Sequence, residues 1–291
     1  MEKVSICIPA YNNAASLDRL LRSVCMQTFR DYKIYLTDDS DCGDVEKLVS
    51  GNTNLDIVYH KNETRLGPTA NTNAVLRMAE GAYIKVMHHD DCFAEADSLA
   101  QMVKLLDDNP DADIAFCGTK EIKYNDDGTV NEKESYDRCI SDIERWQLDT
   151  DIRNLFLVNM IGAPSATLVR NKGILMDEQL KWLVDIDWYI RILKENPKYA
   201  DTLQPLISVG LMETQVTKSC LADEELIFRE NGYFFDKYDL YKEESYRKFL
   251  IRTALGFGYG YDKLKPHRIG WFEYLNIKLR WILKKGSYHQ K

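Results

Sequence analysis

The sequence predicts an α/β fold in which a mainly parallel sheet is flanked by helices and followed by a helical C-terminal extension. Short apolar segments of strand length alternate with amphipathic segments of helical length through the first 118 residues. The composition, with 45% hydrophobic and 29% charged residues, is that of an ordinary globular protein. Strict alternation is typical of parallel sheets, because each helix carries the chain back to the edge where the next strand begins.

The alternation starts with a buried strand at Val4–Ile8 and a helix at Ser16–Phe29, in which Leu17, Leu20 and Val24 lie on one face. The next elements keep the same order. We expect further strands at 33–36, 57–59, 83–87 and 113–117, and further helices at 45–50, 69–79 and 99–106.

After residue 118 the elements are sparser. The sequence predicts a hairpin around 125–128, a strand at 165–169 and a helix at about 185–193. No linker rich in Pro, Ser or Gly, no repeat and no low-complexity run interrupts the sequence. We therefore expect one compact domain over residues 1–220 and a helical extension over 221–291.

Charge and cysteine content limit the class of partner and the compartment. The 46 acidic residues outnumber the 38 Lys and Arg, which argues against nucleic-acid binding, since phosphate backbones attract basic surfaces. The excess reverses from Lys263 onward, where eight basic residues accompany one acid, Glu273, so we expect the tail to meet an anionic partner.

Seven cysteines form no CxxC pair, and the sequence has no signal-peptide pattern and no apolar run of membrane-spanning length. The expected location is the cytoplasm.

Polar and acidic clusters follow three of the predicted strands. They are Pro9–Asn13, Thr37–Asp41 and His88–Asp91. In open α/β sheets ligands bind beyond the carboxyl ends of the strands, so we expect these clusters to converge on one site. Adjacent carboxylates at Asp90 and Asp91 suit a hard divalent cation such as Mg²⁺ or Mn²⁺, although an acidic turn or a helix N-cap would have the same sequence.

The convergence of acidic strand ends with Tyr11, an aromatic side chain able to stack on a planar base, indicates a nucleotide-diphosphate site. The common phosphate-binding loops are absent, since the sequence has no GxxxxGK(S/T) motif and no GxGxxG motif after the first strand. Gly256, Gly258 and Gly260 come too late in the chain and lack a strand-turn-helix context. A P-loop NTPase and a Rossmann dehydrogenase are therefore disfavoured.

Several sequence blocks resemble family 2 glycosyltransferases of the GT-A fold, in order and spacing, over about residues 3–220. The matching blocks are Val4–Asn13, Ser23–Phe29, Asp38–Ser40, Ala79–Ile84 and Asp90–Asp91. The resemblance implies a Rossmann-like GT-A catalytic domain at 1–220, with a nucleotide-binding half at 1–118 and an acceptor half at 119–220. It leaves 221–291 as a helical extension with a basic tail.

The resemblance assigns a nucleotide-sugar site to the strand ends. The residues implied to bind the nucleotide are Pro9, Ala10, Tyr11, Asn12, Asp39 and Asp90. In the family, the acidic pair after the fourth strand ligates a metal ion that bridges the diphosphate. This implies that Asp91, together with Asp90, holds Mn²⁺ or Mg²⁺.

The later blocks resemble the acceptor side and the catalytic helix of the family. Val184–Arg191 matches the helix in which an Asp precedes an Arg by six residues, which implies that Asp185 is the general base. An Asp that only caps a helix would fit the same pattern. The residues implied on the acceptor side are Pro164, Ser165, Asp187 and Trp188.

Three positions depart from the family pattern. His88 stands where the first Asp of the acidic block usually lies, and Val184 replaces a Glu before the catalytic Asp. Met212 begins a block that often starts with a metal-binding His, and a thioether is a poor ligand for Mg²⁺. A third protein ligand for the ion is therefore not identified.

The implied reaction is transfer of a sugar from a nucleotide diphosphate-sugar, with UDP favoured, to a hydroxyl of a glycan or lipid-linked acceptor in cell-envelope polysaccharide synthesis. The anomeric carbon would be inverted. Two other classes remain open. One is a nucleotide-sugar-binding protein that has lost catalysis, which the departures at His88 and Met212 would permit. The other is a sugar-1-phosphate nucleotidyltransferase, whose glycine-rich loop is missing from Pro9–Asn13.

The basic segment 263–285 is expected to include a helix from Gly270 to Lys285 that carries two apolar stripes. The broad stripe consists of Trp271, Phe272, Leu275, Leu279, Ile282 and Leu283. The narrow stripe consists of Tyr274, Ile277 and Trp281 and has a basic rim. We expect the broad stripe to pack on the catalytic domain and the narrow one to rest on an anionic membrane, on the inner face of the cell membrane. The alternative is that both stripes are buried in the protein or in an oligomer contact.

Overall fold

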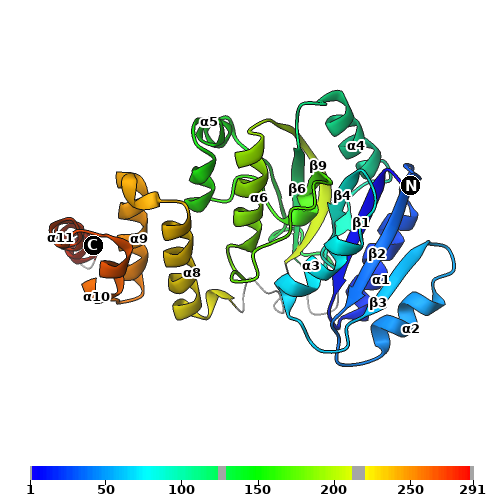
Figure 1. Ribbon diagram of the computed structural model, residues 1–291, viewed down its shortest axis with the longest axis horizontal. Helices are drawn as coiled ribbons and strands as arrows, with labels where there is room; N and C mark the ends of the chain where they lie inside the picture. Colours follow the sequence, from blue (N-terminus) through cyan, green and yellow to red (C-terminus); the bar gives the residue numbers. More distant parts are fainter. Residues whose placement is uncertain (1, 124–128, 212–219, 289–291) are drawn as a thin grey trace. The chain divides into compact units, whose positions relative to one another are not determined.

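The computed structural model describes residues 2–123, 129–211 and 220–288 (Figure 1). The chain forms two compact units. The first consists of residues 1–155 with 159–213, and the second of residues 156–158 with 214–291. The sheet lies in the first unit, whereas the second unit is helical.

The first unit is built around one mixed sheet (Figure 1). Its described strands are β1 (Val4–Ala10), β2 (Tyr32–Asp38), β3 (Ile57–Lys61), β4 (Tyr83–Val86), β5 (Cys92–Phe93), β6 (Ile114–Lys123), β7 (Tyr136–Arg138), β8 (Thr167–Arg170) and β9 (Tyr199–Leu211). They follow the order β3-β2-β1-β4-β8-β6-β9-β5, and β7 pairs with β6. Strands β3, β2, β1 and β4 are parallel to one another, and β6 is parallel to β9. Because β8 is antiparallel to both β4 and β6, these two parallel groups point the same way.

Helices connect and flank these strands (Figure 1). Those of the first unit are α1 (Ala14–Cys25), α2 (Asp44–Gly51), α3 (Pro68–Met78), α4 (Ser98–Asp108), α5 (Asp142–Thr150) and α6 (Val184–Glu195). Two short 3₁₀ helices, η1 (Ile152–Phe156) and η2 (Pro164–Ala166), precede β8. The predicted α/β fold, a mainly parallel sheet flanked by helices, is confirmed.

Burial explains why the strand-helix alternation could be predicted. Every residue of β1 is buried, as is typical of a central parallel strand covered on both faces. Helix α1 buries Leu17, Leu20 and Val24 in the same core, and it begins where the side chain of Asn13 accepts a hydrogen bond from the Ser16 backbone amide at 3.2 Å. The two-residue strand β5 was not predicted, because so short a segment shows no periodicity.

A close approach between β1 and the turn before β4 requires a glycine at position 81. The backbone amide of Gly81 donates to the Ser5 hydroxyl at 2.8 Å. A Cβ atom at this position would lie 2.7 Å from the Ser5 backbone nitrogen and 3.1 Å from the Val4 carbonyl carbon. Both atoms belong to the buried backbone of the central strand, which cannot move aside easily. The pairing of β1 with β4 therefore depends on this glycine.

We predict that Gly81→Ala lowers the free energy of unfolding by about 1–3 kcal/mol, because the added methyl group must displace backbone of β1. Gly51→Ala at the end of α2 is the matched control, since nothing lies within 4 Å of a Cβ there. Urea denaturation of both variants measures the difference. Equal stability of the two variants would contradict the prediction.

The second unit consists of helices with an aromatic core. They are α8 (Glu224–Lys237), η3 (Leu240–Lys242), α9 (Glu244–Gly256), α10 (Tyr261–Leu264), η4 (Lys265–His267) and α11 (Trp271–Tyr288). Phe156 stacks on Phe234 with ring centroids 5.1 Å apart and meets Phe249 edge-on at 5.0 Å. These offset and edge-to-face contacts are the favoured geometries of aromatic pairs.

The structure reverses the predicted orientation of α11. Tyr274, from the narrow stripe, is buried, whereas Phe272 and Leu283, from the broad stripe, are 84% and 74% exposed. The reason is an anchor on the narrow side, where both carboxylate oxygens of Glu273 accept from the Nε of Arg247 in α9 at 3.0 Å. The expectation that the broad stripe is the packed one is therefore wrong. Within the described ranges, none of the helices combines the length and hydropathy needed to cross a bilayer.

Candidate active site

The carboxyl ends of the parallel strands bring the predicted site residues to one edge of the sheet. In the register of β1 and β2, Ala10 lies opposite Asp38, so the residues that follow each strand are neighbours. The Asp39 backbone amide donates to the Ala10 carbonyl at 3.0 Å. In the parallel register of β1 and β4, the Met87 amide donates to the Cys7 carbonyl at 2.9 Å, so His88–Asp91 lies beside Pro9–Asn13. The predicted convergence of the three clusters is thus present in the structure.

The turn from β1 to α1 is shaped by two asparagines. Asn12 and Asn13 have positive φ angles of 49° and 46°, a region that Asn tolerates better than most residues. The Asn12 amide donates to the Ser40 hydroxyl at 2.6 Å, and the Asn12 side chain accepts from the Asp41 amide at 3.2 Å. Pro9 and Ala10, the preceding residues, are buried in β1. Asn12 therefore joins the first two strand-end loops.

Tyr11 is covered by an arginine that the sequence did not single out. The Arg65 guanidinium lies 4.4 Å from the centroid of the Tyr11 ring, and the Tyr11 hydroxyl donates to Asp41 at 3.2 Å. A guanidinium stacks on an aromatic face and carries donors for anionic oxygens. The pair places a guanidinium beside an aromatic ring at the strand ends. No sequence motif marks Arg65, because its place over Tyr11 depends on the fold of the loop after β3.

Asp39 is held rigidly by the loop that begins α3. Its carboxylate accepts from the backbone amides of Leu66 and Gly67, both at 2.8 Å, and from the side-chain amide of Asn62 at 3.0 Å. Two carboxylate oxygens have about four lone-pair sites, so one further donor can still be accepted. The neighbouring Asp38 is fully buried and accepts from the Tyr59 hydroxyl at 2.8 Å. Of the adjacent pair Asp38 and Asp39, Asp39 is therefore the one with a carboxylate site left for a ligand.

Asp90 and Asp91 lie at the end of the β4 segment. Asp91 is almost fully buried, and its burial, followed by the adjacent Asp90 charge, raises its pKa well above the usual value. Burial also lowers the pKa of both His88 and His89, which favours their neutral forms. The two carboxylates form an acidic pair at a buried strand end.

The carboxylate oxygens of this acidic pair are suited to a hard divalent cation. Carboxylate oxygens are the ligands preferred by Mg²⁺ and Mn²⁺, and such ions commonly keep waters and substrate phosphate oxygens as further ligands. Within the described residues, no three His, Cys, Asp or Glu side chains are grouped closely enough to bind a metal by themselves. Asp91 and Asp90 are therefore the protein ligands available to an ion here. Met212, the position discussed as a third ligand, lies outside the described residues, as does the rest of its block to Thr217.

A buried lysine supports the serine that is hydrogen-bonded to the acidic pair Asp90–Asp91. Lys85 in β4 is fully buried, and its ammonium donates to the carbonyls of Ser165 and, at 3.2 Å, Thr167. Burial lowers the pKa of Lys85 to about 8. The Ser165 hydroxyl in turn accepts from the His88 amide at 3.0 Å and is hydrogen-bonded to Asp91. A charged residue inside an apolar strand was a signal in the sequence that pointed to Lys85.

Asp185 opens α6, as the sequence predicted. Its carboxylate accepts from the Ile186 backbone amide at 2.8 Å and from the Asn159 side-chain amide at 3.2 Å. Burial raises the pKa of Asp185 to about 6, and the backbone amides and the charge of Arg138 oppose this shift. Asp185 is therefore mostly ionised at pH 7 and more basic than an exposed Asp.

Asn159, which the sequence did not single out, orients the Asp185 carboxylate. The Asn159 side-chain oxygen, Oδ1, accepts from the backbone amides of Ile161 at 3.2 Å and Gly162 at 2.9 Å. This arrangement turns the side-chain NH₂ group toward Asp185. Arg138 in β7 donates to the Asn159 backbone carbonyl and secures the loop. The Asn-x-x-Gly spacing was the available signal, since Asn side chains commonly bond backbone amides two or three residues later.

The four residues predicted on the acceptor side lie in the interior of the unit. Pro164 and Ser165 are buried in η2, and the Ser165 hydroxyl accepts from the His88 amide near the acidic pair. Asp187 is fully buried and accepts from the Nε of Arg191 at 2.7 Å. Trp188 is 2% exposed, and its indole N–H donates to the Ile174 carbonyl at 2.8 Å. Asp187 and Trp188 therefore contribute to packing, and in this structure neither offers a surface to an acceptor.

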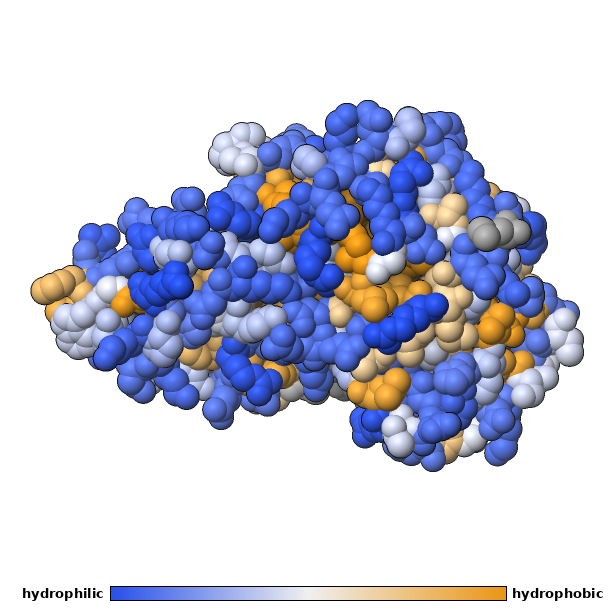
Figure 2. Space-filling model, in the orientation of Figure 1, coloured by the Kyte–Doolittle hydropathy of each residue, from blue (hydrophilic) through white to orange (hydrophobic). Residues whose placement is uncertain are grey.

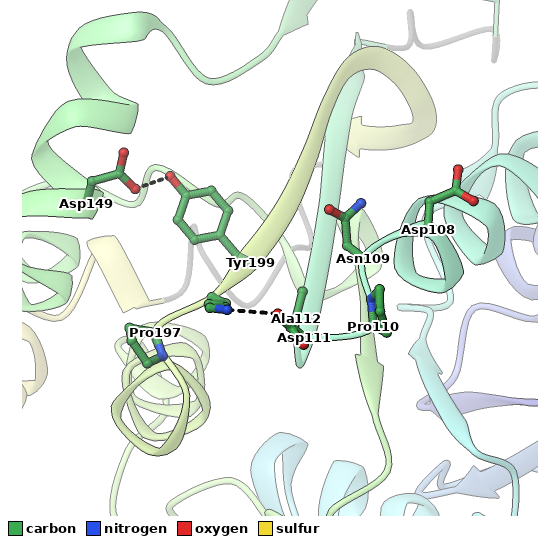
Figure 3. Close-up of a pocket in the computed structure, with 9 residues that line it drawn as sticks. Asp108, Asn109, Pro110, Asp111, Ala112, Asp149, Pro197 and Tyr199 are labelled. Carbon is green, nitrogen blue, oxygen red and sulfur yellow. Dashed lines mark hydrogen bonds and ion pairs between the residues drawn. The ribbon is translucent and has the colours of Figure 1, made fainter.

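A cavity of about 640 Å³ lies at the opposite edge of the sheet (Figure 3). Its lining residues are Asp108, Asn109, Pro110, Asp111, Ala112, Asp149, Pro197, Lys198 and Tyr199. Strands β6 and β9 begin here, with Ile114 paired to Tyr199, so the cavity faces the amino ends of the strands. Its polar groups are already paired, Tyr199 with Asp149 at 2.6 Å and Lys198 with Asp111 at 2.8 Å. The cavity is therefore separate from the candidate site.

Comparison with known proteins identifies the family. Residues 5–174 match the family model described as glycosyl transferase family 2, which is more than half of the chain. The chain belongs to glycosyl transferase family 2. The matched range includes Tyr11, Asp39 and the Asp90–Asp91 pair, so the resemblance predicted from the sequence blocks is confirmed.

Curated relatives of this family 2 glycosyltransferase come from several bacteria. An uncharacterized glycosyltransferase of Haemophilus influenzae is 23% identical over 196 residues, 66% of this chain and 62% of that protein. Abequosyltransferase RfbV of Salmonella typhimurium is 36% identical over 123 residues, 40% of this chain and 36% of that protein. A GalNAc(5)-diNAcBac-PP-undecaprenol beta-1,3-glucosyltransferase of Campylobacter jejuni is 30% identical over 94 residues, 31% of this chain and 30% of that protein. The chain thus matches less than two thirds of the length of each relative.

Solved structures share the fold at low sequence identity. S. aureus TarS 1-349 in complex with UDP-GlcNAc has a TM-score of 0.62 at 15% identity and covers 94% of this chain and 79% of that one. The mannosyltransferase PcManGT of Pyrobaculum calidifontis, in complex with GDP-Man and Mn²⁺, has a TM-score of 0.59 at 14% identity, with 99% and 80% covered. These likenesses support the GT-A fold of the chain.

The raised pKa of Asp185 has a consequence for stability. The folded-state pKa of about 6 exceeds the usual 3.8, so the folded chain binds this proton more tightly than the unfolded chain. Stability is therefore lost as the pH rises from about 4 to 6. We predict that Asp185→Asn raises the free energy of unfolding at pH 7 by about 1–3 kcal/mol and that the gain shrinks toward pH 4. Urea denaturation at both pH values measures it, and a gain independent of pH would contradict the prediction.

Proposed function

We propose that the chain is an inverting glycosyltransferase that moves a sugar from a nucleotide diphosphate-sugar to a hydroxyl of a glycan or lipid-linked acceptor in cell-envelope polysaccharide synthesis. The observation that carries this proposal is the pair of separated carboxylate sites in one unit. Asp91 and Asp90 form an anionic strand end suited to a cation, and Asp185 is a tuned, oriented base at a helix start. A single displacement needs both of these parts and no covalent intermediate on the protein.

The donor is assigned to the strand-end edge. Tyr11 with Arg65 offers a stacking surface for a base, and Asp39 keeps an acceptor site for a base N–H, which favours UDP. Pro9, Ala10 and Asn12 shape the backbone beneath the nucleotide. The complexes of TarS with UDP-GlcNAc and of PcManGT with GDP-Man support a nucleotide-sugar donor and leave the base to be tested.

Asp91, assisted by Asp90, is assigned to hold Mn²⁺ or Mg²⁺. The Mn²⁺ in the PcManGT complex supports this assignment. When bound, the ion supplies neutralisation of negative charge on the departing diphosphate. The protein contributes the position of the Asp91 carboxylate, which is hydrogen-bonded to the Ser165 hydroxyl, and Lys85 in turn donates to the Ser165 carbonyl. Neutral His88 and His89 add no competing positive charge.

Asp185 is assigned to accept the proton of the acceptor hydroxyl. General-base assistance of this kind is typically worth about 10²–10⁴-fold in rate, and it is most effective when the pKa of the base is near the working pH. The pKa of about 6 meets that condition better than the ordinary value expected from the sequence. Asn159 holds the carboxylate toward the acceptor during the transfer.

The names of two relatives and the basic tail support the proposed acceptor class and location. RfbV is named as a sugar transferase, and the name of the Campylobacter jejuni relative specifies a sugar chain on PP-undecaprenol, which supports a glycan or lipid-linked acceptor. A cytoplasmic enzyme that rests peripherally on the inner face of the membrane would meet a lipid-linked acceptor directly. This location remains part of the proposal.

Two variants separate donor binding from transfer. We predict that Asp185→Asn lowers the transfer rate by about 10²–10⁴-fold and leaves the donor Kd unchanged, because only the base is removed. Asp91→Ala is expected to weaken Mn²⁺-dependent donor binding as well. Calorimetry measures donor binding, and release of nucleotide diphosphate in the presence of donor, Mn²⁺ and acceptor measures transfer.

The control for these variants is Asp108→Asn, a carboxylate at the opposite edge of the sheet, which should change neither quantity. Transfer retained in Asp185→Asn would refute the base assignment. No release of nucleotide diphosphate by the unaltered chain with any donor would favour the sugar-binding alternative. Release of pyrophosphate from a nucleoside triphosphate and a sugar 1-phosphate would favour the nucleotidyltransferase.

The orienting role of Asn159 predicts a loss in kcat rather than in donor binding. We predict that Asn159→Ala lowers kcat about 10-fold to 100-fold with an unchanged donor Kd, because Asp185 then samples unproductive positions. Asn196→Ala, at the other end of α6, is the matched control, since its side chain bonds the Asp111 carbonyl and the Lys198 backbone amide, both away from Asp185. A donor Kd that rises in step with the fall in kcat would instead indicate a damaged fold.

A further inference from the structure

Helix α11 presents an apolar face that the protein leaves uncovered. At about 100° per residue, the broad stripe spans an arc of about 120°. Its exposed fractions are Trp271 48%, Phe272 84%, Leu275 37%, Leu279 55%, Ile282 54% and Leu283 74%. In Figure 2 orange and white side chains are visible at the left end of the view, where Figure 1 labels α11. Single exposed apolar residues are ordinary, whereas six on one helical face indicate an interaction surface.

The rotation of the helix is fixed by its opposite face. Tyr274 is 2% exposed and packs against Tyr261 of α10 with ring centroids 5.6 Å apart. The bond between Arg247 and Glu273 joins the same side of α11 to α9. The exposed stripe can therefore not turn inward without breaking both contacts.

Basic residues border this apolar arc. By the same helical spacing, Lys278 lies about 20° beyond one edge of the arc and Arg280 about 60° beyond the other. From Lys263 to the end of the chain eight Lys and Arg accompany one acid, and that acid, Glu273, is already neutralised by Arg247. The segment has no unpaired acidic charge of its own to repel an anionic surface.

We propose that α11 is an interfacial helix that lies in the plane of an anionic membrane, with the broad stripe inserted among the lipids and the basic edges at the headgroups. An amphipathic helix with an apolar face and Lys or Arg at its borders has the chemistry of such a helix. This inference deepens the proposed function, since it names the surface through which a lipid-linked acceptor is approached. It assigns the membrane to the stripe opposite to the one expected from the sequence.

Charge favours lipid over a second copy of the chain. A two-fold pairing through the broad stripe would bring two basic tails together, each with a net charge of +7 from residue 263 onward. Lys residues are also depleted in protein interfaces, whereas anionic headgroups attract them. An anionic bilayer satisfies the apolar arc and its basic edges at once.

Vesicle flotation of the full chain, without donor or acceptor, tests the inference. The chain is expected to float with vesicles of 70% phosphatidylcholine and 30% phosphatidylglycerol at low salt, and to remain unbound with pure phosphatidylcholine. Phe272→Gln combined with Leu279→Gln should reduce the bound fraction at least about 10-fold, because apolar burial is lost without a change in charge. Arg280→Gln should weaken binding at low salt and make the remaining binding less sensitive to salt, because one electrostatic contact is lost.

The matched control is Leu203→Gln, because Leu203 in the first unit is 55% exposed, the same fraction as Leu279. It should float like the unaltered chain. Failure of the unaltered chain to float, or an equal loss in Leu203→Gln, would overturn the inference. Light scattering that shows a dimer dissociated by the double variant would also overturn it and assign the face to a second copy. Because no substrate is present, each of these failures leaves the proposed reaction untouched.

Discussion

The parallel pairing of β1, β2 and β4 is the constraint on which the rest of the site depends. It places the ends of three buried strands side by side, so the polar residues that follow them must share one edge. The closeness of β1 and β4 is possible because Gly81 leaves room for the Ser5 backbone. The loops after these strands then bond one another, through Asn12 and Ser40 and through Asp39 and Gly67. Tyr11, Asp39 and Asp91 are thus positioned by the sheet rather than by each other.

Two aspartates with raised pKa values lie in different surroundings. Asp91 is buried next to another carboxylate, so its raised pKa reflects crowded negative charge that a cation would relieve. Asp185 is partly buried at a helix start, without a carboxylate beside it among the causes of its shift. The first environment suits a metal ligand and the second a proton acceptor. The carboxylates of Asp91 and Asp185 thus suit different chemistry because their surroundings differ.

The sequence predicted what depends on local pattern and missed what depends on tertiary contacts. Strand-helix alternation, the acidic strand ends and the start of α6 at Asp185 are readable because burial periodicity and capping are local. The stacking of Arg65 on Tyr11 and the orientation of Asp185 by Asn159 join residues that are far apart in the chain. For α11 the sequence held two apolar stripes, and the contacts of Tyr274 with α10 and of Glu273 with α9 decided which one was buried. The family resemblance implied Trp188 on the acceptor side, whereas in the structure its indole N–H donates to the Ile174 carbonyl within the core.

The most direct test of the donor site is a crystal structure of the chain with UDP and Mn²⁺, in which anomalous scattering locates the ion. We expect the anomalous peak within bonding distance of the Asp91 carboxylate and the uracil ring beside Tyr11 and Asp39, above the ends of β1 and β2. Nucleotide or Mn²⁺ bound instead in the cavity lined by Asp111 and Tyr199, at the opposite edge of the sheet, would contradict the assignment of the strand-end edge as the donor site.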